Sequence, residues 1–183
     1  GRSIGRIIGK RAFWSLELAL GPGSLEPRPE TEAVVELALE LMPPAEKEAT
    51  IADIGVGSGA ILLAILSERP LAYGVGLDIA REALADARQN AERHQLAGRS
   101  AFVAGDFAAS LAGAFDIVVS NPPYVETAVS EALSPTVIDH DPRLALDGGP
   151  DGMTAYRAVF AEARRILKPG APLIVEIDPR AYD

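Results

Sequence analysis

The sequence predicts an α/β protein with a doubly wound, mostly parallel sheet. From residue 50 onward, short apolar strands alternate with helical segments, and glycines lie at the turns between them. This alternation is typical of parallel βαβ units. The chain has 183 residues, of which 48% are hydrophobic and 23% are charged. It is therefore long enough for one domain with a sizeable core.

The expected elements follow this order along the chain. An alternating apolar and polar pattern predicts a half-buried, hairpin-like strand at Ala12–Leu20. A helix is expected over residues 29–42, with one buried face made of Val34, Leu37, Ala38 and Leu41. The strands that follow are expected at Thr50–Ile54, Leu71–Leu77, Ser100–Ala104, Phe115–Ser120 and Pro172–Ile177. The helices between them are expected at Gly59–Glu68, Arg81–His94 and Thr154–Leu167, the last with Phe160 on its apolar face.

Residues 121–150 have no secondary-structure period and contain five prolines. A patternless stretch of this length inside a compact domain usually has a functional role. We therefore expect this stretch to have a functional role of its own.

The composition excludes several classes of function. The chain has no cysteine, which excludes disulfides, thiolate metal ligands and a cysteine nucleophile. Because His94 and His140 are the only histidines, we expect no metal site and interpret Asp139-His140-Asp141 as a loop. No apolar run reaches the roughly 18 residues of a membrane span, and we expect a cytoplasmic protein.

The charge favours a small-molecule or protein substrate. The formal net charge is −9, which argues against duplex DNA because neutralisation of phosphates supplies most non-specific affinity. The first 30 residues nevertheless have five basic and three acidic side chains. We interpret this basic start as a solvated segment, and a partner-facing patch is the alternative.

A glycine-rich loop follows the first strand of the parallel pattern. Gly55, Gly57 and Gly59 lie between that strand and a helix, where glycines permit a tight turn and close approach of a ligand. The third glycine comes one residue early for the dinucleotide-binding pattern, and no Gly-Lys-Ser/Thr follows, which excludes a P-loop. On its own, the loop is also compatible with a simple structural turn.

Three acidic residues stand at the ends of successive strands. They are Asp53, Asp78 and Asp106, and Asp78 comes 19 residues after Gly59. In an open α/β sheet, ligands bind outside the carboxyl ends of the strands, and a carboxylate there can accept both hydroxyls of a ribose. Each acid alone is also compatible with a turn or a helix cap. Together with the glycine loop, they predict a crevice for an adenosine-bearing ligand.

Asn121-Pro122-Pro123-Tyr124 follows directly after an apolar strand. Proline ends strands because it lacks the N–H group that a ladder needs, and this alone can explain the motif. The same restriction holds the backbone extended, so that the Asn121 side-chain oxygen and the Pro122 carbonyl can face a crevice. Two such acceptors suit a planar amino group, because they orient its nitrogen and stabilise positive charge that develops during attack. Tyr124 is expected to pack on the plane of that group.

These motifs resemble those of class I S-adenosylmethionine-dependent methyltransferases that act on amino groups. Four further segments are similar to the HemK-like glutamine methyltransferases of peptide chain release factors: LEPRPETE (25–32), SNPPYV (120–125), DPRLALDGGPDGMTAYR (141–157) and LKPGAPLIVEI (167–177). The resemblance extends from about Ile7 to Ile177. It implies a Rossmann-like core and methyl transfer from S-adenosylmethionine to the amide nitrogen (N5) of a release-factor glutamine.

The resemblance also implies roles for individual residues. The glycine loop would bind the methionine part of the cofactor, Asp78 the ribose, and Asp106 and Phe107 the adenine, with Asp53 and Asn121 completing the cofactor site. Asn121 and Pro122 would hold the glutamine amide. The substrate side would be formed by Pro27, Arg28, Pro29, Glu30 and Thr31, a segment that is equally compatible with a helix N-cap.

The domain organisation implied by the resemblance has two parts. Residues 1–28 would be a basic lead with a hairpin-like segment that joins an absent N-terminal helical domain, and residues 29–183 would be the catalytic domain without its last strands. Glu26 departs from the family, which usually has an aliphatic residue there. Three alternatives remain: glutamine methylation of a ribosomal protein, methylation of adenine N6 in nucleic acid, and a non-enzymatic S-adenosylmethionine-binding interaction module.

Overall fold

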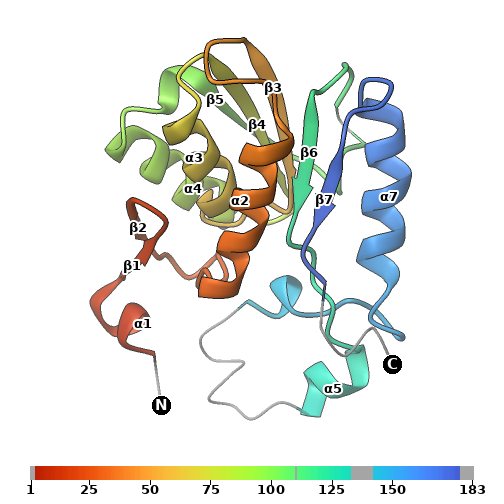
Figure 1. Cartoon of the computed structure of the whole chain (residues 1–183). Coiled ribbons are helices and arrows are strands. Elements are labelled where there is room, and N and C mark those ends of the chain that lie inside the picture. Colours follow the sequence, from red (N-terminus) through yellow and green to blue (C-terminus); the bar gives the residue numbers. More distant parts are fainter. Residues whose placement is uncertain (1–2, 110, 133–141, 178–183) are drawn as a thin grey trace.

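A five-stranded parallel sheet forms the centre of the computed structural model, which describes residues 3–109, 111–132 and 142–177 (Figure 1). The order β5-β4-β3-β6-β7 confirms the predicted doubly wound fold. The strands are β3 (Ala49–Ile54), β4 (Ala72–Asp78), β5 (Ser100–Ala104), β6 (Ile117–Ser120) and β7 (Leu173–Val175). From β3 the chain runs outward to β5 and then returns to β6 on the other side of β3. This reversal makes the carboxyl ends of β3 and β6 a topological switch point, where ligands bind in open sheets.

Helices cover both faces of the sheet (Figure 1). On one face, α2 (Glu32–Leu41), α3 (Ala60–Glu68) and α4 (Arg81–Arg93) contribute to one apolar cluster. On the other face, α7 (Thr154–Ile166) packs on a second cluster. Alternate strand residues belong to opposite clusters, as the period of two in a strand requires: Val119 of β6 belongs to the first and Val118 to the second.

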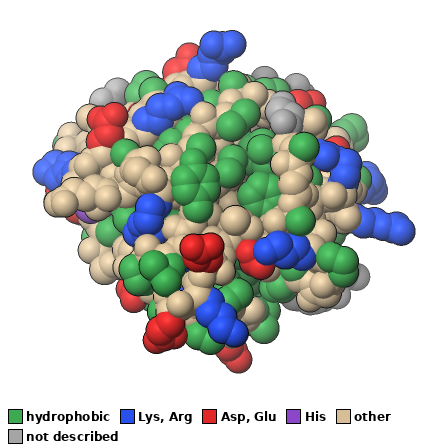
Figure 2. All heavy atoms as spheres, turned by 90° about the horizontal axis from the view of Figure 1, so that it is seen from above, with side chains coloured by type: hydrophobic (Ala, Val, Ile, Leu, Met, Phe, Trp, Pro, Cys, Tyr) green, Lys and Arg blue, Asp and Glu red, His purple; other side chains and the backbone are tan. Residues whose placement is uncertain are grey.

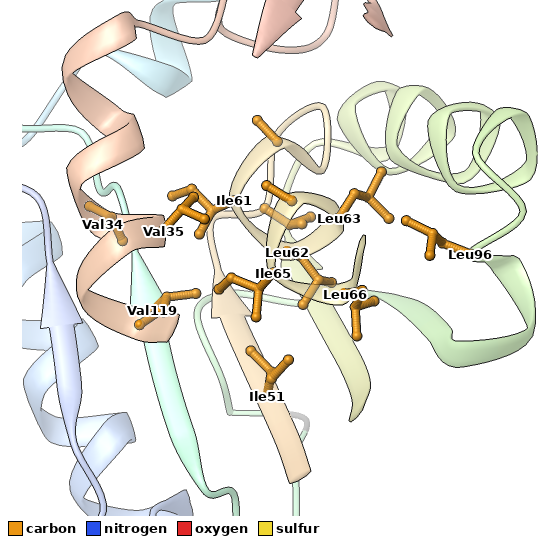
Figure 3. Close-up of a cluster of buried hydrophobic side chains, with 14 of the residues drawn as sticks. Val34, Val35, Ile51, Ile61, Leu62, Leu63, Ile65, Leu66, Leu96 and Val119 are labelled. Atoms are coloured by element: carbon orange, nitrogen blue, oxygen red, sulfur yellow. The ribbon is translucent and has the colours of Figure 1, made fainter. Parts of the chain in front are cut away.

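The α3 helix is the most buried element of the first layer. Every side chain from Ala60 to Leu66 is buried, and Figure 3 shows the larger ones, which are Ile61, Leu62, Leu63, Ile65 and Leu66, between α2, α4 and the sheet. Glycine in β4 permits this close packing, because a Cβ added to Gly74 would lie 2.5 Å from Leu62 Cδ1. The loop that leads into α3 is thereby fixed against the sheet.

The N-terminal residues form a small hairpin outside the parallel sheet, and its Phe13, Leu16 and Leu18 belong to the first apolar cluster. A short helix, α1 (Ile4–Ile8), precedes β1 (Lys10–Phe13) and β2 (Leu16–Ala19), which pair antiparallel. The hairpin-like strand expected at Ala12–Leu20 is therefore two shorter strands, with a turn at Trp14, whose φ is 54°.

The predicted strands and helices of the sheet region are present; β5 has the predicted bounds, and the ends of the other elements differ by at most three residues. Two predictions of burial were wrong. Leu37 and Leu41 are 42% and 49% exposed, because the helical period fits a second set of positions equally well and that set faces the core: Thr31, Val34, Val35, Ala38 and Met42. Phe160 is 52% exposed on α7.

The described parts of residues 121–150, which are 121–132 and 142–150, contain regular structure that their sequence pattern does not indicate. They contain α5 (Thr127–Ala132), a 3-10 turn at Arg143–Ala145 and a bridge between Val125 and Asp147. Two further 3-10 turns lie at Pro29–Thr31, before α2, and Ala97–Arg99, before β5. The segment Asp139-His140-Asp141 lies outside the described residues. Among the described helices, none is long and apolar enough to cross a bilayer.

Candidate active site

A cavity of about 410 Å³ lies at the carboxyl ends of the strands. Loops after β3, β4, β5 and β6 form one side of it, and residues 23–31 and 142–159 contribute the other. The opposite end of the sheet is the face seen in Figure 2, where hydrophobic side chains are interspersed with acidic and basic ones. The cavity is therefore at the end of the sheet that the positions of the three acids predict.

The glycine loop forms the floor of the cavity. Gly55, Gly57 and Gly59 have φ angles of 79°, 54° and 85°, a region that other residues rarely adopt. Gly55 and Gly57 line the cavity, and a Cβ added to Gly57 would have no atom within 4 Å. Gly59 is placed differently: it precedes α3, and a Cβ there would lie 2.9 Å from Leu63 Cδ1. Two of the glycines thus leave room for a ligand, whereas the third leaves room for the helix.

Asp78 lines the cavity at the end of β4 and is held rigidly by backbone groups. Its Oδ2 accepts the N–H of Gly57 at 3.0 Å, and its Oδ1 accepts the N–H of Ala80 at 2.9 Å. Burial raises the pKa of this carboxyl, and the backbone hydrogen bonds partly offset the rise. Each carboxylate oxygen can accept a second hydrogen bond. Asp78 is therefore held in a fixed orientation and can still accept hydrogen bonds from a ligand.

Asp53 lies at the same end of β3 but behind the cavity wall. It is 1% exposed, and neither carboxylate oxygen has a hydrogen-bond partner within the described ranges. Burial raises its pKa to about 7, and the charge of Asp78 adds to the rise. A buried carboxyl in this state favours either a proton or a nearby cation.

The third strand end supplies the outer wall. Asp106 is exposed and Phe107 is partly buried with a φ of 49°, and both line the cavity. Sequence reasoning missed Ile79, which also lines the cavity although it is 58% exposed. The only sequence signal for it is a large apolar residue directly after the acid that ends β4.

Asn121 and Pro122 line the cavity where β6 ends. The Asn121 Nδ2 donates to Thr31 Oγ1 at 3.3 Å. The glycine loop is close by, since a Cβ added to Gly55 would lie 4.0 Å from the Asn121 backbone oxygen. Tyr124, expected to cover the amide, is not among the lining residues.

The segment before α2 contributes only some of the predicted residues. Pro27 and Thr31 line the cavity, whereas Arg28, Pro29 and Glu30 are exposed and do not. Glu26 is buried instead, and its carboxylate accepts a hydrogen bond from Ser3 and pairs with Arg11 at 3.2 Å. The acid that stands in place of an aliphatic residue thus attaches the N-terminal helix and hairpin to this segment.

Residues 142–159 form a wall that sequence reasoning did not assign to the cavity. Asp147 Oδ1 accepts from Thr127 Oγ1 at 2.7 Å and from the N–H of Gly149 at 2.9 Å. A Cβ on Gly148 would lie 2.8 Å from Tyr124 Cα, and one on Gly152 would lie 2.6 Å from Tyr124 O. The glycines of this wall therefore allow it to pack directly on the backbone that follows Asn121, and their clustering was the signal available in the sequence.

The fold is that of the class I methyltransferases. Among solved structures, the chain is similar to the Thermus thermophilus 16S rRNA N2 G1207 methyltransferase in complex with AdoMet and guanosine, with a TM-score of 0.65 at 22% identity over 93% of this chain and 41% of that one. It is also similar to the hMettl16 catalytic domain in complex with an RNA hairpin, with a TM-score of 0.65 at 15% identity over 82% of this chain and 57% of that one. At these identities the likeness shows the fold alone.

Residues 31–150 match the model of the methyltransferase small domain, and the chain belongs to this family. The chain is 54% identical to the release factor glutamine methyltransferase of Bradyrhizobium diazoefficiens over 96% of this chain and 60% of that protein. It is 49% identical to the enzyme of the same name from Caulobacter vibrioides, over 95% of this chain and 60% of that protein. The chain thus spans about 60% of the length of these curated relatives.

Proposed function

We propose that the protein transfers a methyl group from S-adenosylmethionine to the side-chain amide nitrogen of a glutamine in a peptide chain release factor, and that it does so in the cytoplasm. Relatives that carry this name at 54% and 49% identity support the substrate. The structural support is a single observation: the glycine loop and Asn121 adjoin each other in one cavity at the switch point. A cofactor on the loop and an amide on Asn121 would therefore meet.

The residues present fit S-adenosylmethionine. Gly55 and Gly57 leave open space beside the loop, Asp78 has free acceptor capacity for a ribose, and the buried Asp53 carboxylate favours a nearby cation such as an ammonium. Ile79 and Phe107 offer an apolar surface for adenine. When bound, the cofactor supplies a methyl group that is already activated by its positively charged sulfur.

The chain's own residues would mainly provide orientation. An amide nitrogen is a poor nucleophile, because its lone pair is delocalised into the carbonyl. The Asn121 side-chain oxygen and the Pro122 carbonyl would each accept one of its N–H groups, which fixes the nitrogen and stabilises the charge that develops on it. Holding the reacting atoms about 3–3.5 Å apart accounts for a large share of such a rate enhancement. The proton that the nitrogen loses would pass to solvent.

The remaining predicted residues are proposed in more limited roles. Pro27 and Thr31 line the cavity and are placed to face the substrate, and Arg28, Pro29 and Glu30 would contact it from outside. Gly59 would act by positioning α3. Tyr124 would support the Asn121 backbone through the glycines packed against it.

The experiment is methyl transfer by the full-length gene product with labelled S-adenosylmethionine. The acceptors are a release factor, the same factor with its candidate glutamine replaced by alanine, a ribosomal protein fraction and RNA. We expect label on the intact release factor and none on the replaced one. Label on RNA or on a ribosomal protein alone would contradict the proposed substrate, and cofactor binding without any transfer would support the interaction-module alternative.

A further inference from the structure

We infer that Thr31 and Glu176 are positioning residues that determine which way the Asn121 side-chain amide faces. This inference rests on the proposed function, in which Asn121 accepts a hydrogen bond from the substrate amide. The sequence analysis gave Glu176 no role, although it lies in the segment LKPGAPLIVEI (167–177). It reaches Asn121 only through the pairing of two strands that are far apart in the chain.

The backbone places Glu176 beside Asn121. Glu176 directly follows β7, and its N–H donates to the carbonyl of Ser120 at 3.0 Å, one residue before Asn121. The Tyr156 hydroxyl of α7 donates to the Glu176 carbonyl at 3.1 Å. Both backbone polar groups of Glu176 are therefore hydrogen-bonded, which fixes the position from which its side chain starts.

The side chain of Glu176 lies behind the cavity wall. Its Oε2 is buried and has no hydrogen-bond partner among the residues that the structure describes, and Glu176 does not line the cavity. Burial raises the pKa of the Glu176 carboxyl. Hydrogen bonds from the side chains of Thr31 and Asn121 lower that pKa. The charge of Glu30 adds to the rise and that of Arg28 opposes it.

The hydrogen-bonding capacities of Glu176, Thr31 and Asn121 determine which way the Asn121 side-chain amide is turned. An ionised carboxylate can only accept hydrogen bonds, whereas a threonine hydroxyl has one hydrogen to donate. When the Thr31 hydroxyl donates to Glu176, its oxygen can only accept, and Asn121 Nδ2 is 3.3 Å from it. If the amide were flipped, Asn121 Oδ1 would lie against the Thr31 oxygen, whose hydrogen is already donated to Glu176, and the two oxygens would repel each other. The carboxylate therefore keeps Oδ1 available to the cavity, where the proposed substrate would need an acceptor.

Nuclear magnetic resonance tests the orientation without any substrate. In ¹⁵N-asparagine-labelled full-length protein, the side-chain amide of Asn121 is assigned by its loss in Asn121→Ala, and that of Asn90 by its loss in Asn90→Ala. We expect hydrogen exchange of that amide to be slowed in the wild type and accelerated about tenfold or more in Thr31→Val and Glu176→Gln. Thr31→Ser, which keeps the hydroxyl, should behave as the wild type, and the Asn90 amide should not change.

Kinetics tests the consequence. Thr31→Val and Glu176→Gln should each lower kcat about 10-fold or more, the range expected when a hydrogen bond to a charged group is lost. The Kd for S-adenosylmethionine and the melting temperature should stay near the wild-type values, and Thr31→Ser should retain kcat. Protonation of Glu176 removes the pure acceptor, so wild-type kcat should fall toward acid pH more steeply than that of Glu176→Gln.

Two results would overturn the inference. The first is an Asn121 amide whose exchange does not respond to Thr31→Val or Glu176→Gln. The second is a loss of kcat accompanied by equal losses in cofactor affinity and melting temperature, which indicates a purely structural role. If the wild type does not methylate the release factor, the proposed function fails, but the resonance experiment still decides the orientation.

Discussion

The two ends of the cavity are built in different ways. At the glycine-loop end, backbone groups do the positioning: Asp78 is held by the N–H groups of Gly57 and Ala80. At the Asn121 end, side chains do the positioning. The Thr31 hydroxyl that contacts Asn121 comes from 90 residues earlier in the chain. The first end uses residues 53–107, whereas the second brings together segments near residues 31, 121, 147 and 176.

This difference has a physical consequence. Backbone hydrogen bonds between adjacent strands and loops survive most side-chain changes, so the glycine-loop end should tolerate substitution of its neighbours. A site made of long-range side-chain contacts loses its geometry when one member changes. We therefore expect substitutions at the glycine-loop end to affect binding, and substitutions at the Asn121 end to affect turnover.

Asn121→Ala gives the largest expected effect. It removes one of the two proposed acceptors and the orientation of the substrate nitrogen, so kcat should fall at least about 10³-fold, a range typical of losing a group that stabilises developing charge and positions the reactant. The Kd for S-adenosylmethionine, measured by calorimetry, should remain nearly unchanged. The control is Asn90→Ala: Asn90 bonds to the backbone of Ala19 and of Ser58 in the glycine loop, so its loss should lower stability and leave kcat at saturating cofactor intact. Near-normal turnover of Asn121→Ala would remove Asn121 from the mechanism.

Asp53→Asn should change how stability depends on pH. The folded-state pKa of about 7 lies above the ordinary value of 3.8, so the folded protein binds more protons between these pH values, and the free energy of unfolding should decrease as pH rises through that window. The upper bound is about 4 kcal/mol, at about 1.4 kcal/mol per unit of pKa. Asp53→Asn should flatten this decrease in denaturant titrations at pH 4 to 8.

Asp116→Asn is the control of opposite sign. Burial raises the pKa of Asp116, but hydrogen bonds from Lys168 and Thr50 more than offset this and leave it lowered. Its contribution to stability is therefore present above the ordinary pKa and is lost as pH falls through the lowered one. If the free energy of unfolding depends on pH in the same way in the wild type and in Asp53→Asn between pH 4 and 7, the raised pKa is not that of Asp53.

Asp78→Ala should weaken cofactor binding with little effect on turnover at saturation. Loss of a charged acceptor for the ribose predicts an increase in Kd of about 10- to 100-fold. Asp106→Ala, at an exposed position, should have a smaller effect, and Asp151→Ala should have none, because Asp151 pairs with Arg157 on the surface. An unchanged Kd for Asp78→Ala would contradict the placement of the cofactor ribose beside Asp78.

Gly57→Ala should produce the smallest change. Its φ of 54° makes alanine cost about 1 kcal/mol of stability, and the new methyl group would project into the cavity and raise the cofactor Kd several-fold. Gly170→Ala is the matched control, because Gly170 has a φ of 78° and equally open surroundings but does not line the cavity. The two variants should lose similar melting temperature, and only Gly57→Ala should bind cofactor more weakly. Equal affinities would contradict the placement of the ligand beside the loop.

The sequence was sufficient to predict the sheet and the glycine-loop end, because both depend on local patterns. Strand periodicity, glycines at turns and acids at strand ends lie within a few residues of the features that they predict. The α2 face was predicted only in part: Val34 and Ala38 are buried as expected, whereas Leu37 and Leu41 are not. An apolar helix fits the period in two registers, and only packing against the sheet selects Val35 over Leu37.

The Asn121 end was predictable only in part. Asn121 itself stands in a recognisable motif, but its contact with Thr31 depends on the docking of a distant segment. Glu176 enters through the β6–β7 pairing, and Gly148 and Gly152 through close packing on Tyr124. Such contacts leave no periodic trace in a single sequence.

The most direct test of the account is to locate the transferred methyl group. The full-length protein is incubated with S-adenosylmethionine and a release factor, and the modified peptide is sequenced by tandem mass spectrometry. The account predicts one added methyl group on the side-chain amide nitrogen of a single glutamine, absent with Asn121→Ala. A methyl group on an oxygen or sulfur atom or on a different side chain would contradict it.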